Sequence, residues 1–191
     1  MTRQAPIKPT VVLPDTAPLI HLAAVDALHV LTSIGPVVVV DVVAMEATYH
    51  ADKPQAGRIA AWIAEGRRIG TNGPVAVVET EFGPLYRLAL ETGVKRPRNS
   101  GEIAITEWLV EFLPQIGGTA LVVYENGKVP NMLAREGIAG DVAVATTRNL
   151  LELAEAEGII PDAEALWRRV IAATPNANPA SVRTTINKVK I

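Results

Sequence analysis

The chain contains no cysteine, which excludes disulfide bonds, thiolate metal sites and a cysteine nucleophile. Aromatic side chains are also scarce, at 4% of 191 residues. No apolar run is long enough to span a bilayer, because the longest aliphatic stretch, Val37 to Met45, is short and contains Asp41. The N-terminus lacks the apolar segment of a signal peptide, so we expect a cytoplasmic protein without a membrane partner.

Neither sign of charge dominates the chain. The sequence has 18 Lys and Arg residues against 20 Asp and Glu residues, for a net charge of -2. A nucleic acid would therefore have to bind through a local basic cluster rather than through bulk charge. Hydrophobic residues make up 49% of the sequence, as is typical of a globular protein, and the length corresponds to about one domain.

Short aliphatic runs alternate with amphipathic stretches, a pattern typical of parallel strands covered by crossover helices. We therefore predict a single α/β domain over residues 11–173, with three α/β/α layers and a central, mostly parallel sheet. Residues 1–10 are expected to form an N-terminal arm and residues 174–191 a C-terminal tail. The predicted strands are Val11 to Leu13, Val37 to Asp41, Val75 to Val78, Thr119 to Tyr124 and Asp141 to Ala145.

Three further helices are predicted after the fourth strand. Asn126-Gly127 is a favoured hairpin pair, but Pro130 would remove a ladder donor, so Lys128 to Glu136 is predicted to be mostly helical. Arg148 to Glu157 and Asp162 to Ala173 are predicted to be the closing helices.

Four acidic residues stand where functional groups collect in such a fold, outside the carboxyl ends of the strands. Asp15 follows the first predicted strand and Glu125 the fourth, Glu46 lies one short turn beyond the second, and Glu102 opens the helix before the fourth. Carboxylates held close together repel unless a cation neutralises them, and Mg²⁺ or Mn²⁺ prefers such oxygen ligands. The four side chains are therefore candidate metal ligands and catalytic residues.

Each of these residues also has a purely structural interpretation. Asp15 is placed to cap the following helix, Glu102 to form a capping box with Asn99, and Glu125 to serve in a turn. Glu46 fits a solvated helix face, although its apolar neighbours favour a partly buried carboxylate that needs a partner. The spacing alone does not decide between these interpretations.

Basic residues cluster at Lys95, Arg96 and Arg98, just before Glu102. Such a run is either solvated surface or a loop that contacts a substrate backbone beside the predicted metal site. The three histidines are scattered and form no zinc-binding pattern, so each is expected to be partly buried or on the surface.

In their order and placement, four motifs resemble those of the PIN-domain nucleases, especially the bacterial and archaeal branch. The first motif is the most specific of the four. The matching segments are Asp15-Thr16-Ala17-Pro18-Leu19-Ile20, Val42-Val43-Ala44-Met45-Glu46, Gly101-Glu102-Ile103-Ala104-Ile105 and Leu121-Val122-Val123-Tyr124-Glu125-Asn126.

This resemblance implies a PIN-like fold and an endoribonuclease that depends on Mg²⁺ or Mn²⁺ and cleaves single-stranded RNA. It further implies the toxin half of a toxin-antitoxin pair, with an antitoxin protein as partner and a homodimeric assembly. The implied metal ligands are Asp15, Glu46, Glu102 and Glu125. By the same resemblance Thr16 supports the site through its hydroxyl, and Asn126 holds water or a ligand.

The chain departs from the family pattern in its fourth motif, where Glu125-Asn126 replaces the usual aspartate. The third acidic position of the family also varies, which makes Glu107 an alternative to Glu102. A PIN-like module that binds RNA or protein without cutting is therefore the main rival function. A metal hydrolase acting on small phosphate compounds is a third.

Overall fold

The computed structural model describes residues 8–68, 73–125 and 141–174. These residues form a five-stranded sheet with the order β3-β2-β1-β4-β5, in which every pair of neighbouring strands is parallel. The architecture is the three-layer α/β/α fold predicted from the sequence. The strands are β1 (Val11–Pro14), β2 (Val37–Val40), β3 (Val75–Val78), β4 (Thr119–Val123) and β5 (Asp141–Ala145).

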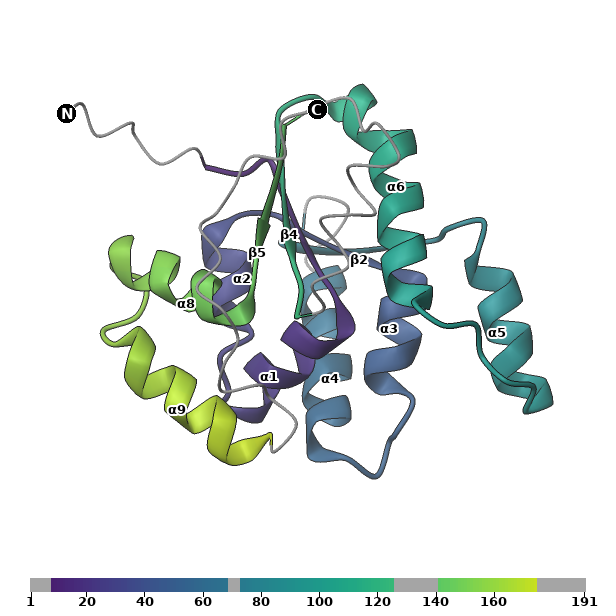
Figure 1. Cartoon of the computed structure of the whole chain (residues 1–191), viewed down its shortest axis with the longest axis horizontal. Coiled ribbons are helices and arrows are strands. Elements are labelled where there is room, and N and C mark those ends of the chain that lie inside the picture. Colours follow the sequence, from purple (N-terminus) through teal and green to yellow (C-terminus); the bar gives the residue numbers. More distant parts are fainter. Residues whose placement is uncertain (1–7, 69–72, 126–140, 175–191) are drawn as a thin grey trace.

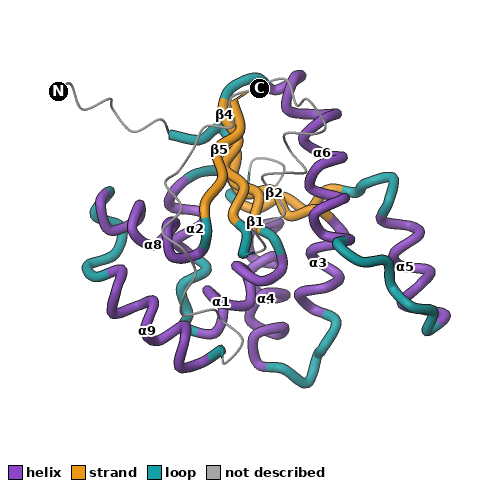
Figure 2. Tube along the Cα trace, in the orientation of Figure 1, coloured by secondary structure: helices purple, strands orange, loops and turns teal. Residues whose placement is uncertain are grey.

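Helices cover both faces of the sheet, as Figures 1 and 2 show. On one side α6 contacts β2, and on the other α8 contacts β5, with α2 and α9 packed on α8. None of the helices within the described ranges has the length and apolar character that crossing a bilayer requires. The helices are α1 (Thr16–Ala24), α2 (His29–Ile34), α3 (Asp41–Thr48), α4 (Pro54–Arg68), α5 (Gly83–Thr92), α6 (Ser100–Ile116), α8 (Thr147–Ala156) and α9 (Ala163–Ala173).

The strands are rich in valine because both faces of a parallel sheet are covered and need apolar, β-branched side chains. All four residues of β1 are buried, as are Ala120 to Val123 in β4. The sequence placed β3 and β5 correctly to the residue. The predicted strands at β2 and β4 are each one residue too long. The predicted helix Lys128 to Glu136 lies outside the described residues.

Strand β2 ends one residue earlier than predicted, because Asp41 starts α3 directly without a loop. Its Oδ1 accepts hydrogen bonds from the Val42 backbone N–H at 2.9 Å and from the Thr80 hydroxyl at 2.8 Å. Its Oδ2 is buried against Gly83 and has no hydrogen-bond partner among the described residues. A Cβ on Gly83 would lie 1.7 Å from this oxygen, so only glycine permits α5 to approach α3 here.

The turn between β3 and α5 is held by Glu107, the residue offered above as an alternative to Glu102. Its two carboxylate oxygens accept hydrogen bonds from the backbone N–H groups of Glu81 and Phe82, the latter at 3.2 Å. These contacts connect α6 to the start of α5. Glu107 therefore has a structural role at this turn, and the acidic residue of α6 that faces the predicted site is Glu102.

We expect Glu107→Gln to lower the free energy of unfolding by about 1 kcal/mol, because an amide supplies one acceptor oxygen for two N–H donors. Urea denaturation measures the change. Glu111→Gln, one turn further along α6 at an exposed position, is the matched control and should stay within about 0.5 kcal/mol of the parent. Equal losses in the two variants would contradict the assignment.

Candidate functional site

The predicted acidic residues lie at the point where the strand order of the sheet reverses. From β1 the chain moves through β2 to β3, and then returns to add β4 on the other side of β1. Asp15 is the first residue after β1, and its backbone N–H donates to the carbonyl of Val123 at the end of β4. Glu125 follows two residues later, so β1 and β4 bring both carboxylates to the same edge. This is the usual position of ligand sites in open α/β sheets.

The Asp15 carboxyl group is buried, with 8% of the residue exposed. Its pKa rises from 3.8 to about 7, mainly because of burial; the Thr16 N–H lowers it in part, and the charges of Glu102, Glu46 and Glu125 add to the rise. The four predicted carboxylates therefore interact electrostatically. Although Asp15 occupies the N-cap position of α1, its side chain completes no cap hydrogen bond, so capping does not account for its burial.

Glu46 approaches Asp15 from α3. Its Oε2 accepts a hydrogen bond from the Thr16 hydroxyl at 2.7 Å, which is the supporting contact expected for Thr16. Gly101, at the start of α6, faces both carboxylates: a Cβ there would lie 2.7 Å from Asp15 Oδ1 and 3.4 Å from Glu46 Oε2. Asp15 Oδ1 and Glu46 Oε2 therefore lie on either side of the same small space, separated by no more than the sum of these two distances. The missing side chain of Gly101 leaves the space between them open.

Glu102 follows Gly101 in the first turn of α6 and contributes to the negative potential at Asp15. The capping box predicted as its structural interpretation is incomplete, because Asn99 occupies the N-cap but makes no side-chain cap hydrogen bond. Asn99 instead has a left-handed backbone with φ of 58°. This sharp entry turns the chain so that the first residues of α6 face the acidic cluster.

Glu125 is fixed by contacts that the sequence did not reveal. Its Oε1 accepts a hydrogen bond from the Thr147 backbone N–H at 2.9 Å, at the start of α8, and lies 3.6 Å from His21 Nδ1. Burial opposes ionisation of Glu125, but the hydrogen bonds from His21 and Thr147 outweigh it and lower the pKa below the usual value. Glu125 is therefore ionised and held, rather than a simple turn residue.

Sequence reasoning missed the contact of His21 with the candidate site, since this histidine was expected only to be partly buried or on the surface. It is 7% exposed, its Nδ1 lies 3.4 Å from the Thr147 hydroxyl, and its ring packs edge-on against Trp167 of α9. No local pattern in the sequence indicates this contact. The partners Thr147 and Trp167 are more than 120 residues away, as the separation of 126 between His21 and Thr147 shows.

The basic segment predicted to bind substrate divides in the structure. Arg96 turns toward the acidic cluster: its guanidinium lies 3.5 Å from the Tyr86 hydroxyl and 4.9 Å from the centre of the Tyr49 ring. Lys95 and Arg96 line a cavity together with Tyr49, at the end of α3, whereas Arg98 is exposed. Asn126, predicted to hold water or a ligand, lies outside the described residues.

The donor set fits a hard divalent ion in its chemistry, because four carboxylates and a hydroxyl are the oxygen ligands that Mg²⁺ and Mn²⁺ prefer. Among the described residues, however, no group of three or more acidic or histidine side chains is already arranged around a common ion position. Like charges repel, and two of the carboxylates take other partners: Glu46 accepts from Thr16, and Glu125 from Thr147. Binding an ion would require side-chain rotation around the space at Gly101.

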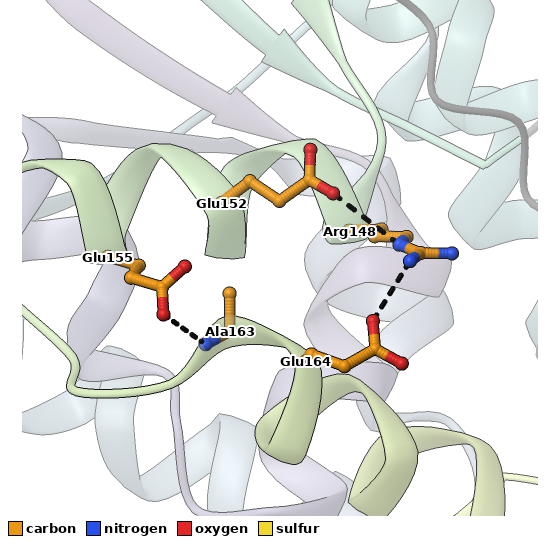
Figure 3. Close-up of a pocket in the computed structure, with 5 residues that line it drawn as sticks. All are labelled: Arg148, Glu152, Glu155, Ala163 and Glu164. Carbon is orange, nitrogen blue, oxygen red and sulfur yellow. Dashed lines mark hydrogen bonds and ion pairs between the residues drawn. The ribbon is translucent and has the colours of Figure 1, made fainter.

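A second polar cavity, of about 330 Å³, lies between α8 and α9. Figure 3 shows that its charged groups are already paired: the Arg148 guanidinium contacts Glu152 at 3.6 Å and Glu164 at 2.9 Å. Glu155 accepts from the Ala163 backbone N–H at 3.4 Å. These contacts connect the two helices, so we assign the cavity a structural role.

Comparison of the chain with protein-family models, with curated proteins and with solved structures gives no significant match. The function must therefore be argued from the residues of the site. Its distinguishing feature is the approach of four carboxylates, from four separate segments, to the buried end of β1.

We expect Asp15→Asn to stabilise the protein in metal-free buffer, and more so as the pH rises. The folded state holds the Asp15 proton up to about pH 7 and the unfolded state only to 3.8, so the parent loses stability between these values. The variant carries no such charge. Thermal unfolding should show a small difference at about pH 4 and one on the order of 3 kcal/mol at about pH 8.

Asp52→Asn removes an exposed carboxyl group and serves as the control. The difference in unfolding free energy between this variant and the parent should not grow with pH. A gain for Asp15→Asn that stays constant across this range would contradict the buried, charge-crowded environment of Asp15.

We expect Gly101→Ala to reduce the stabilisation that Mn²⁺ confers, because the added Cβ occupies the space between Asp15 and Glu46. A ligand that binds only the folded state raises the melting temperature by mass action, so the shift at fixed Mn²⁺ reports binding. Gly57→Ala on α4 is the matched control, since nothing lies within 4 Å of its new Cβ. It should gain up to about 1 kcal/mol from helix propensity and keep the full Mn²⁺ shift.

Proposed function

We propose that this protein is a PIN-type endoribonuclease that uses Mg²⁺ or Mn²⁺ to hydrolyse phosphodiester bonds within single-stranded RNA. The observation that carries the proposal is the Asp15 carboxyl group at the switch point of the sheet, whose pKa is raised to about 7 by burial first and by three other carboxylates in addition. Several acids held together in this way repel one another and suit a divalent cation. The motif order described for the sequence supports the same assignment.

In this proposal Asp15, Glu46, Glu102 and Glu125 hold the cation. Bound there, the ion supplies orientation and deprotonation of a water molecule and neutralises charge on the leaving oxygen. Thr16 keeps Glu46 in place through its hydroxyl, 2.7 Å from Oε2. His21 and Thr147 restrain Glu125, so that its longer side chain occupies a defined position where the family carries aspartate.

The proposed substrate follows from two basic side chains, Lys95 and Arg96, which form a basic rim beside the four carboxylates. A phosphodiester carries a negative charge that the carboxylates alone would repel. Arg96, which lies close enough to Glu46 to interact with its charge, and Lys95 supply the local positive charge that the net charge of -2 does not. Contacts of this kind position a nucleic-acid backbone without reading its sequence.

The resemblance also leads us to propose a biological setting, a toxin paired with an antitoxin protein and assembled as a homodimer. Several apolar side chains of α5 and α6 are exposed and offer contact surface, among them Leu85, Leu88 and Val110. Residues 175–191 of the predicted C-terminal tail lie outside the described residues.

A second candidate is a PIN-like module that binds RNA without cutting it. Two observations favour it: no three acidic or histidine side chains in the described part of the chain already surround an ion position, and Glu125 is engaged by Thr147 and His21. In this case Lys95 and Arg96 would bind the RNA backbone, and the carboxylates would have no catalytic role.

Highly purified protein should cut single-stranded RNA internally when Mg²⁺ or Mn²⁺ is present and should stop when the metal is chelated. Asp15→Asn and Glu46→Gln should each lower the rate at least about 100-fold, because each removes a charge that holds the ion. Gel analysis of end-labelled RNA measures cleavage, and circular dichroism checks the fold.

Glu164→Gln provides a control within the second polar cavity, at a carboxylate already paired with Arg148. It should cut like the parent. RNA that remains intact with either metal, or an Asp15→Asn variant as fast as the parent, would favour the non-cutting module.

A further inference from the structure

A cavity of about 420 Å³ opens beside the acidic cluster, at the carboxyl end of α3. Its volume lies within the roughly 300–1,000 Å³ of small-molecule sites. The lining combines one aromatic ring, two cations and aliphatic groups: Tyr49, Lys95, Arg96, Ala89, Leu90 and Val94. Tyr49 is 48% exposed, so its ring is accessible from solvent.

One pair of planar groups in the cavity is already stacked, the Arg96 guanidinium over the Tyr49 ring. The Arg96 guanidinium lies 4.9 Å from the centre of the Tyr49 ring, and the His50 ring packs edge-on against Tyr49 with centroids 5.0 Å apart. The contact of Arg96 with the Tyr86 hydroxyl restrains the guanidinium from the buried side. Aromatic rings and guanidinium planes are the surfaces on which proteins stack unpaired bases.

The stack adjoins the proposed metal ligands. Tyr49 lies three residues after Glu46 at the end of α3, with its backbone N–H directed to the Glu46 carbonyl at 3.4 Å. Side chains at this spacing are neighbours on a helix surface. Glu46 also raises the pKa of Tyr86, after the larger effect of burial, so Tyr86 connects the cluster to Arg96.

We infer that this cavity binds a nucleotide of single-stranded RNA next to the scissile phosphodiester, with its base against Tyr49 and its phosphate on Lys95 and Arg96. The inference rests on the proposed function and names the part of that site which holds the substrate. An aromatic plane with adjacent cations matches a base with its phosphate, whereas aliphatic lining alone would match an apolar peptide. A flanking nucleotide fixed here orients the neighbouring phosphodiester toward Asp15 and Glu46.

Fluorescence anisotropy with a short labelled single-stranded RNA tests the inference, in a buffer with chelator so that no cleavage occurs. Tyr49→Ala should weaken binding about tenfold, the effect of losing one stacked base. Tyr49→Phe keeps the ring and should bind like the parent. Arg96→Gln should weaken binding and reduce its salt dependence, because one phosphate contact is lost.

Two controls separate stacking from general charge. Arg168→Gln removes an exposed cation from α9, outside the cavity, and should leave binding unchanged. A strand of the same length with abasic positions should bind the parent and Tyr49→Ala equally, because it offers no base to stack. Discrimination by Tyr49 between the normal and abasic strands is the result that supports the subsite.

The outcomes distinguish this subsite from the proposed function. If the parent binds RNA and Tyr49→Ala binds equally well, the subsite is overturned while the nuclease proposal stands. If Tyr49 contributes to binding but RNA stays uncut with metal, the subsite stands and the nuclease proposal fails. A parent that binds no RNA in the chelating buffer overturns the subsite, and the cleavage assay with metal then decides the nuclease proposal by itself.

Discussion

The burial of one carboxyl group, that of Asp15, constrains the rest of the site. β1 ends in the middle of the sheet, between β2 and β4, so the residue that follows it is enclosed on both sides. An ionised carboxylate in this position loses hydration, and three further carboxylates increase the cost of its charge. In the folded protein the Asp15 carboxylate therefore needs either a bound proton or a neighbouring cation. The divalent ion that we propose would meet this requirement and would also supply hydrolytic chemistry.

Hydrogen-bond donors on neighbouring elements keep the other carboxylates apart and oriented. The Thr16 hydroxyl holds Glu46 from α1, and the backbone N–H of Thr147 holds Glu125 from α8. His21 joins α1 to α8 through Thr147 and to α9 through Trp167. The same contacts that pack helices on this face of the molecule thus set the positions of two proposed ligands, and a change in packing would move them.

Charge of opposite sign is arranged in layers around this centre. The carboxylates lie at the edge of the sheet, Tyr86 stands between them and Arg96, and Arg96 and Lys95 border the open cavity at Tyr49. A phosphate approaching from solvent would meet cations before carboxylates. This order supplies the local positive charge that the proposed RNA substrate needs on a chain with a net charge of -2.

The sequence alone determined the fold class and the strands, because valine-rich runs and helical periodicity are local signals; β3 and β5 were placed to the residue, and β2 differed only where Asp41 starts α3 directly. It also selected Asp15, Glu46, Glu102 and Glu125, through their places after strands and at a helix start.

Only the tertiary structure decided which contacts these residues make. Strand order brought Glu125 beside Asp15, Gly101 left space between two carboxylates, and His21 met Thr147 across 126 positions. Such long-range contacts leave no periodic or local pattern in a sequence, because they arise from packing between elements.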